Sequence, residues 1–315
     1  MKLQPRVKPT GLFDVQYAAF LKTVSHLRAR LHRYCTRMVG SAMDGEDIIQ
    51  EALFEAYRKV DQLEDARALQ GWLFRIAHNR CIDFLRNRKA RERAEANYAE
   101  EEIILPVEPT GFGAGRAIER LVIHLPPKER ACVLLKDVFD YSLEEIAELV
   151  DSTVGGVKSA LNRGRTKLAF LPARPSVPVA VVAPDPQLSR LLNRYVDLFN
   201  QRDWDGVRAL ASADARLRVS DCFNGLLVDS PYFLEFDRAQ TPWRIDIGEV
   251  EGETVLIVLF EKHDGWLPTY PVRVHLRDGV IDAITDYYAC PWLLPTADNV
   301  RVNGRPIFDK VERGS

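Results

Sequence analysis

The segment Ser152–Leu168 (STVGGVKSALNRGRTKL) gathers side chains that bind nucleic acid. It has four basic residues and no acidic one, and it follows a very short turn. Lysine and arginine contact phosphates or guanine, and the amide of Asn162 suits adenine. Uncompensated positive charge on one short helix is typical of the second helix of a helix-turn-helix, which enters the DNA major groove. The expected DNA-binding residues of this segment are Ser152, Thr153, Lys158, Ser159, Asn162, Arg163 and Arg165.

A second face suited to nucleic acid is expected on a helix from about Arg67 to Arg88. Its core side consists of Leu73, Ile76, Ala77, Cys81, Phe84 and Leu85. Its other side consists of Trp72, Arg75, Asn79, Asp83 and Arg86, to which we add Arg88. Such a face suits single-stranded DNA, because bases stack on an aromatic ring while cations follow the phosphates. Composition alone equally allows a core tryptophan among solubilising arginines.

An acidic face is expected on the preceding helix, within residues 43–60. The apolar stripe of this helix consists of Ile49, Ala52, Leu53, Ala56, Tyr57 and Val60, which recur at helical spacing. Another face carries Asp47, Glu51 and Glu55, with Phe54 among them. A solvated surface is the simplest interpretation of the carboxylates. An exposed phenylalanine among them instead indicates a docking surface for a basic partner.

The charge of the 315-residue chain is unevenly distributed. Residues 1–172 hold 27 Lys and Arg against 24 Asp and Glu, a sum of +3, and the remainder holds 16 against 21, a sum of −5, which together give the net charge of −2. The basic excess therefore lies in the part of the chain where DNA contact is expected. The length is sufficient for two or three domains, each with its own core.

The five cysteines favour a reducing compartment. They are scattered, odd in number and without CxxC spacing, so a metal site and a disulfide framework are both unexpected. No apolar run approaches the length of a membrane span, and the first ten residues lack the apolar core of a signal peptide. We therefore expect a cytoplasmic protein without membrane association, metal or cofactor.

Two linkers are expected to divide the chain into three domains. The first linker is acidic and then rich in proline and glycine, and the second has five prolines among fifteen residues. The expected domains are residues 12–97, 115–171 and 187–300, with linkers at 98–114 and 172–186. The first two domains have helical periodicity, whereas the third begins helical and then alternates apolar and polar residues. The fold class is therefore two all-α domains, the second a helix-turn-helix, followed by an α+β domain.

The second domain is expected to contain four helices. Their bounds are Gly115–Leu125, Pro127–Asp140, Ser142–Val150 and Thr153–Leu168. Ser142 and Glu145 form the S-x-x-E pattern of a capping box. In the last helix Val157, Leu161 and Leu168 face inward, so the polar and basic residues lie around the outward arc.

These motifs resemble the sigma-70 family of RNA polymerase subunits and, within it, the short extracytoplasmic-function (ECF) group. The first domain contains GEDIIQEALFEAYRKV and WLFRIAHNRCIDFLRNRKAR and is similar to sigma domain two over about residues 15–93. The second contains LPPKERACVLLKDVFDYSLEEIAELV and the basic helix, and it resembles sigma domain four. A response regulator is the nearest alternative for the helix-turn-helix, but it leaves the first domain unexplained.

The resemblance implies a promoter-specificity subunit whose partners are the RNA polymerase core and promoter DNA. The acidic helix would dock on the coiled coil of the β′ subunit through Asp47, Ile48, Gln50, Glu51 and Phe54. The helix that contains Trp72 would open and read the promoter −10 element. The helix-turn-helix would read the −35 element and touch the flap of the β subunit.

The last helix departs from the commoner family pattern at three positions. Gly156 replaces a threonine, Ala160 an arginine and Gly164 an alanine. The adjacent Gly155 and Gly156 weaken the first helical turn by about 1 kcal/mol each relative to alanine, and they allow close approach of the backbone to phosphate. The −35 sequence therefore does not carry over from relatives.

The third domain resembles the SnoaL-like α+β barrel, a cone with a pocket that could take a small ligand. The resemblance allows an alternative function, a cone-fold enzyme with a DNA-binding appendage. Its candidate groups are His263, His275, Asp246 and Asp286, with Trp243, Trp266, Tyr270 and Tyr287 as walls of the pocket. No spacing ties a histidine to an aspartate, and a fold alone does not establish chemistry. We therefore expect no catalytic residue and a domain that modulates the two helical domains, to which it is tethered.

Overall fold

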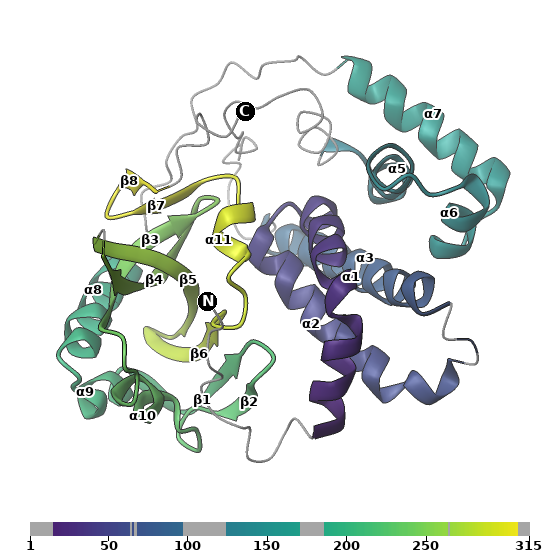
Figure 1. The fold of residues 1–315 in the computed structure, drawn as a ribbon. Coiled ribbons are helices and arrows are strands. Elements are labelled where there is room, and N and C mark those ends of the chain that lie inside the picture. The colour runs from purple at the N-terminus through teal and green to yellow at the C-terminus, as the bar shows by residue number, and fades with distance from the viewer. Residues whose placement is uncertain are drawn as a thin grey trace. The chain divides into compact units, whose positions relative to one another are not determined.

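The structure is a computed structural model that describes residues 15–63, 65, 68–96, 124–170, 186–263 and 265–307. The chain forms two compact units (Figure 1). One is Ala19–Val179, and the other is Ala180–Ser315 together with Met1–Ala18. Among the described residues, no helix is both long and apolar enough to cross a membrane.

The first unit begins with three long helices. They are α1 (Val15–Val39), α2 (Ala42–Arg58) and α3 (Leu69–Ala96), with a short 3-10 turn, η1 (Val60–Gln62), after α2. Gly40 has a φ of 87° and separates α1 from α2, and the Ser41 hydroxyl caps α2 by accepting from the Asp44 N–H at 3.2 Å. The expected helix from Arg67 to Arg88 is confirmed over most of its length and continues to Ala96.

Four further helical elements follow among the described residues of the first unit. They are α5 (Pro127–Val133), the π-helical turn η4 (Leu134–Val138), α6 (Leu143–Leu149) and α7 (Val154–Phe170). The capping box is confirmed, because the Glu145 N–H donates to the Ser142 hydroxyl at 3.1 Å and the Ser142 N–H donates to the Glu145 carboxylate at 2.7 Å. The expected helix over Pro127–Asp140 is instead interrupted by η4. The expected helix Gly115–Leu125 falls almost entirely outside the described residues.

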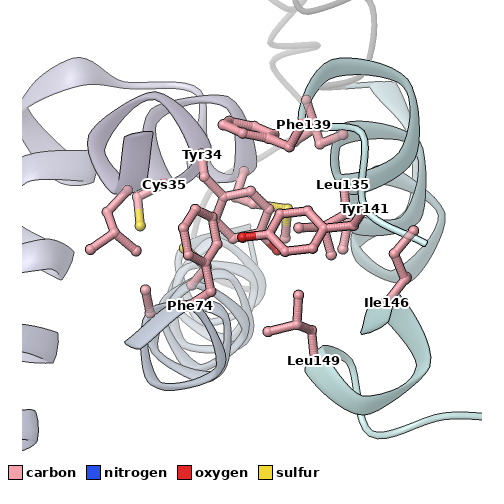
Figure 2. Close-up of a cluster of buried hydrophobic side chains, with 14 of the residues drawn as sticks. Tyr34, Cys35, Phe74, Leu135, Phe139, Tyr141, Ile146 and Leu149 are labelled. Atoms are coloured by element: carbon pink, nitrogen blue, oxygen red, sulfur yellow. The ribbon is translucent and has the colours of Figure 1, made fainter. Parts of the chain in front are cut away.

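One apolar core runs through the first unit. It takes side chains from α1, α2 and α3 and also from α5, η4, α6 and α7. Figure 2 shows its aromatic part, where Tyr34 and Phe74 of α1 and α3 lie against Phe139 and Tyr141. The two expected helical domains therefore share buried surface.

The second unit is a mixed sheet with helices. Its helices are α8 (Pro186–Asn200), α9 (Trp204–Arg208), α10 (Tyr232–Asp237) and α11 (Leu293–Thr296). Its strands are β1 (Ala211–Val219), β2 (Phe223–Leu226), β3 (Trp243–Val250), β4 (Glu253–Lys262), β5 (Gly265–Arg277), β6 (Val280–Asp286), β7 (Val300–Val302) and β8 (Arg305–Pro306). The strand order is β2-β1-β6-β5-β4-β3-β7-β8, and among the described strands only β1 and β6 pair in parallel.

The core of the second unit is rich in aromatic rings. Phe199 of α8 stacks on Tyr195 at 5.3 Å and lies edge-on to Phe236 and Trp243, with ring centroids 4.8 and 5.4 Å away. Such rings each bury a large apolar area, so they fix α8 and α10 against the sheet. The prediction of a domain that begins with helices and continues with strands is thus confirmed, and the strands extend to Pro306.

Candidate nucleic-acid interface

Helix α7 buries one stripe and exposes the opposite arc. Val157, Ala160, Leu161 and Gly164 are buried against α5 and α6. Val157 and Leu161 therefore face inward as predicted, and Leu168 is half-buried. The buried Ala160 lies in the core where the family pattern has arginine, so in this chain that position packs and cannot contact DNA.

The exposed arc of α7 has a polar centre. Lys158, Ser159 and Asn162 are all exposed and, at i, i+1 and i+4, occupy neighbouring surface positions. Thr166, one turn after Asn162, is also exposed and was not among the predicted residues. The same helical spacing could have identified it. These four side chains offer an ammonium, two hydroxyls and an amide, which are the groups that contact phosphate and base edges.

The other cations of α7 are paired with carboxylates of the preceding helices. Arg163 and Lys167 both donate to Glu129, at 2.9 and 2.8 Å, and Arg165 donates to Asp137 at 2.5 and 3.1 Å. The prediction of uncompensated charge is therefore wrong for these three residues. In the described part of the chain, no carboxylate pairs with Lys158.

The Glu129 carboxylate is buried at the base of this ion-pair cluster, with its side chain 8% exposed. Burial acts to raise its pKa, but hydrogen bonds from Lys167 and Arg163 outweigh that effect and lower the pKa below the ordinary value for glutamate. The charged form of Glu129 is thus the stable one. It fixes the direction of two α7 cations from the scaffold side.

The start of α7 is fixed by its own cap. The Thr153 hydroxyl accepts from the Gly156 N–H at 3.0 Å, so this side chain is engaged in the helix. A Cβ at Gly156 would lie 2.7 Å from the Ser152 hydroxyl, whereas a Cβ at Gly155 would meet only ordinary contact distances. Gly156 therefore makes room for the turn of the helix-turn-helix. This space requirement is a structural role in addition to the predicted approach to phosphate.

A second polar face lies on α3. Arg75, Asn79, Asp83 and Arg86 are exposed, and Trp72 is half-buried against the apolar core. Trp72 is therefore partly a core residue and partly exposed, so neither of the two interpretations that the sequence allows is excluded. Arg88 is half-buried and donates to the backbone carbonyl of Val39 at 3.0 Å. One nitrogen of its guanidinium therefore caps the end of α1.

The acidic helix α2 exposes fewer of its predicted partner-binding residues than expected. Glu51 is exposed and Phe54 is 39% exposed, while Asp47 is half-buried. Ile48 and Gln50 are buried at 4% and 9% exposure, so they cannot contact a partner directly in this arrangement. Both residues lie on the packed side of α2. Of the five predicted partner-binding residues, only Glu51 and Phe54 are exposed, and Asp47 lies half-buried beside them.

The candidate groups of the second unit differ in exposure and in their partners. His263 and His275 are exposed, Asp246 pairs with Arg244 at 3.0 Å, and buried Asp286 accepts from the Tyr232 hydroxyl at 2.7 Å. Within the described residues, no group of three or more His, Cys, Asp and Glu could hold a metal ion. All five cysteines are free thiols.

Comparisons with known families match both helical groups. A model of sigma-70 region 2 matches residues 23–91, and a model of sigma-70 region 4 matches residues 115–168. The ECF RNA polymerase sigma factor SigG of Mycobacterium tuberculosis is 32% identical over 215 residues, 60% of this chain and 58% of the relative. The chain thus spans little more than half the length of SigG. The ECF RNA polymerase sigma factor SigW of Bacillus subtilis is 31% identical over 180 residues, 53% of this chain and 95% of the relative.

Solved structures resemble the chain more distantly. The sigma factor RpoE of Bartonella quintana, in complex with the anti-sigma factor NepR, is 23% identical with a TM-score of 0.40, over 48% of this chain and 94% of that one. The ECF sigma factor SigJ of Mycobacterium tuberculosis is 18% identical with a TM-score of 0.34, over 84% of this chain and 95% of that one.

Proposed function

Because the chain belongs to the ECF RNA polymerase sigma factor family, we propose that it directs transcription initiation by binding the RNA polymerase core and promoter DNA. It acts in the cytoplasm, where its polymerase works. Residues 12–97 act as sigma domain two and residues 115–171 as sigma domain four, joined by the linker at 98–114.

The exposed arc of α7 carries this proposal furthest. Lys158, Ser159 and Asn162 lie on a capped helix whose remaining cations are held by its scaffold. A rigid helix with a few outward polar side chains is how a helix-turn-helix reads a groove. We assign this arc to the −35 element. When DNA binds, the neighbouring Arg163 and Arg165 exchange their carboxylate partners for phosphates.

The faces of α2 and α3 complete the assignment. On α2, Glu51 and Phe54 form an acidic and apolar surface for the β′ subunit. On α3, Arg75 and Asn79 lie near half-buried Trp72 and are assigned to the −10 element. An exposed phenylalanine beside a carboxylate supports a protein partner, since it would gain burial and charge complementarity together.

Duplex selection from a random DNA pool tests the α7 assignment. The full chain, held on core polymerase, should enrich one upstream element. Lys158→Ala and Asn162→Ala should each weaken binding to it about 5- to 150-fold, since a base or phosphate contact contributes about 1–3 kcal/mol. Lys89→Ala removes an exposed cation of α3 outside the assigned set and serves as the control. Equal binding by all variants would refute the assignment.

Copurification with core polymerase tests the α2 assignment separately. Phe54→Ala should weaken the complex about fivefold or more, because truncating an aromatic anchor at a binding hot spot costs over about 1 kcal/mol. The matched control is Phe170→Ala, at another exposed phenylalanine of the same unit, 84% exposed. An unchanged complex for Phe54→Ala would remove this surface from the polymerase interface.

The second unit is proposed to be a SnoaL-like control domain, residues 187–300, tethered by the linker at 172–186. Tethering gives it a high effective concentration for its own sigma domains, so that it modulates them without a separate partner. A small ligand bound in its cone would shift that balance only by favouring one arrangement. Deleting the residues after Pro172 should change promoter output in vitro, and unchanged output would remove the control role.

A further inference from the structure

One arginine joins the two surfaces that we assign to polymerase and to DNA. Arg80 of α3 donates from Nε and Nη2 to the same carboxylate oxygen of Glu55, at 2.8 and 2.6 Å. Its Nη1 atom lies 3.9 Å from a carboxylate oxygen of Glu51. Both glutamates belong to α2, whereas α3 is the helix assigned to the −10 element. A cation of the DNA-binding helix is thus paired with carboxylates at the polymerase-binding surface.

Arg80 lies at the edge of the polar face of α3. Asn79 directly before it and Asp83 three residues after it are both exposed members of that face. The Arg80 side chain itself is 39% exposed, so solvent reaches it while it contacts α2. Exposed side chains change rotamer within nanoseconds. Arg80 can therefore turn from α2 toward bound DNA without a movement of the helix.

Of the two glutamates, Glu55 holds Arg80 more firmly. Its side chain is 23% exposed, against 58% for Glu51, so water and salt screen its ion pair less. Lys59 also donates to Glu55 at 2.5 Å. The hydrogen bonds from Lys59 and Arg80 outweigh partial burial and lower the pKa of Glu55 below the ordinary value for glutamate. Glu55 is therefore charged at neutral pH and keeps Arg80 from other anions.

A basic partner on α2 would compete with Arg80 for these carboxylates. Glu51 and Phe54 form the surface proposed for the β′ subunit, and Glu55 lies one turn after Glu51 on the same helix. Cations of the partner that pair with Glu51 and Glu55 would displace the Arg80 guanidinium. The displaced arginine then lies beside the −10 strand. Arginine suits phosphate there, because its planar group donates to two phosphate oxygens at once.

We propose that Arg80 couples polymerase binding to contact with the −10 element: Glu55 and Glu51 hold it in the free chain, and polymerase releases it to a DNA phosphate. The inference rests on the proposed function, because it requires that both surfaces are used. Arg80 is not among the DNA-binding residues expected from the sequence. By linkage, polymerase and DNA should each strengthen the binding of the other through this residue.

A double-mutant cycle on the free full chain tests whether Glu55 withholds Arg80. The probe is a single-stranded oligothymidine of about twelve nucleotides, titrated at several salt concentrations. Glu55→Gln should tighten binding about fivefold and steepen the salt dependence by about 0.7, the value for one added phosphate contact. Glu55→Gln combined with Arg80→Ala should lose both gains. Glu148→Gln, which removes an equal charge from α6, should not change the salt dependence. Gains that persist in the double variant would overturn the proposal.

The same chain on core polymerase tests whether Arg80 is released to DNA. The probe is a duplex from upstream of a transcript that depends on the chain. Arg80→Ala should weaken its binding about fivefold and lower the salt dependence by about 0.7, and Arg80→Lys should restore the salt dependence.

Copurification separates this role from a structural one. Arg80→Ala should bind core polymerase at least as well as the wild type, because Glu51 and Glu55 lose a competitor, whereas damage to α2 would weaken that complex. Unchanged DNA affinity and salt dependence in Arg80→Ala on polymerase would overturn the proposal. A wild-type chain that does not copurify with core polymerase would instead refute the proposed function, and the cycle on the free chain would still decide whether Glu55 withholds Arg80.

Discussion

Glu129 decides how much positive charge α7 presents. It pairs with Arg163 and Lys167 from a position 34 and 38 residues earlier, so no local pattern in the basic segment reveals the pairing. Helical spacing correctly placed Lys158 and Asn162 outside and Val157 and Leu161 inside. The outward arc was therefore predictable from the sequence. The pairing of its cations with carboxylates was not predictable, because it depends on tertiary contacts with α5 and η4.

Replacing Glu129 should separate stability from DNA affinity. Glu129→Gln should lower the free energy of unfolding of α5 and α7 by about 1 kcal/mol, a value kept small because both cations are about half exposed. The same change should strengthen binding to DNA, because two cations lose their carboxylate. Hydrogen exchange and DNA titration would measure the two effects. Glu148→Gln, which removes an equal charge at an exposed site of α6, should produce neither.

Two glycines of α7 should respond oppositely to alanine. Gly155→Ala enters open space, so it should stabilise the helix by up to about 1 kcal/mol. Gly164→Ala would place a Cβ 2.9 Å from a methyl of Val133, and this overpacking should destabilise by about 1 kcal/mol. Thermal unfolding of the free chain would compare them. Equal shifts for both variants would contradict the packing of α7 on α5.

Element bounds were predictable where capping and periodicity agree. Ser142 and Glu145 identified the start of α6 from the sequence alone. The π-helical turn η4 was not predictable, because Leu134–Val138 has the composition of an ordinary helix and its turn leads into Phe139, which packs against α1 and α3. Long-range burial, rather than local preference, thus shapes this element.

The contact between α1 and α3 should weaken in mild acid. The His78 Nδ1 atom is hydrogen-bonded to the buried Tyr34 hydroxyl at 2.8 Å. Burial lowers the pKa of His78 from 6.5 to about 4. The unfolded chain therefore binds a proton at higher pH than the folded chain. This contribution to stability is complete above about pH 6.5 and is lost as the pH falls toward 4.

The expected size of that effect is measurable at pH 5. Lowering the pH from 7 to 5 should reduce the free energy of opening of α1 and α3 by about 2 kcal/mol through His78. His78→Gln should reduce this pH dependence, as read from hydrogen exchange. His26→Gln, at an exposed histidine of α1, should leave it unchanged. A pH dependence that persists in full in His78→Gln would assign it to other groups, such as buried His32.

At the scale of the whole molecule, the sequence separated helical from alternating segments correctly. It could not show that α1–α3 and α5–α7 share one core, because Tyr34 and Phe139 are more than a hundred residues apart and each also fits a core of its own. Nor could it place Asp286 beside Tyr232, a pairing that arises only when α10 packs on the sheet. The secondary-structure class of each segment was thus predictable from the sequence, whereas the contacts between elements far apart in the chain were not.

Transcript mapping in a purified system tests the sigma-factor assignment most directly. Core polymerase, the full chain and genomic DNA of the source organism are combined, and the 5′ ends of the new transcripts are sequenced. We predict transcription starts that require the chain and that share two sequence elements upstream, near −10 and −35. With the Lys158→Ala variant, the starts should no longer share the element near −35. Transcripts that do not depend on the chain, or starts without any shared upstream element, would contradict the assignment.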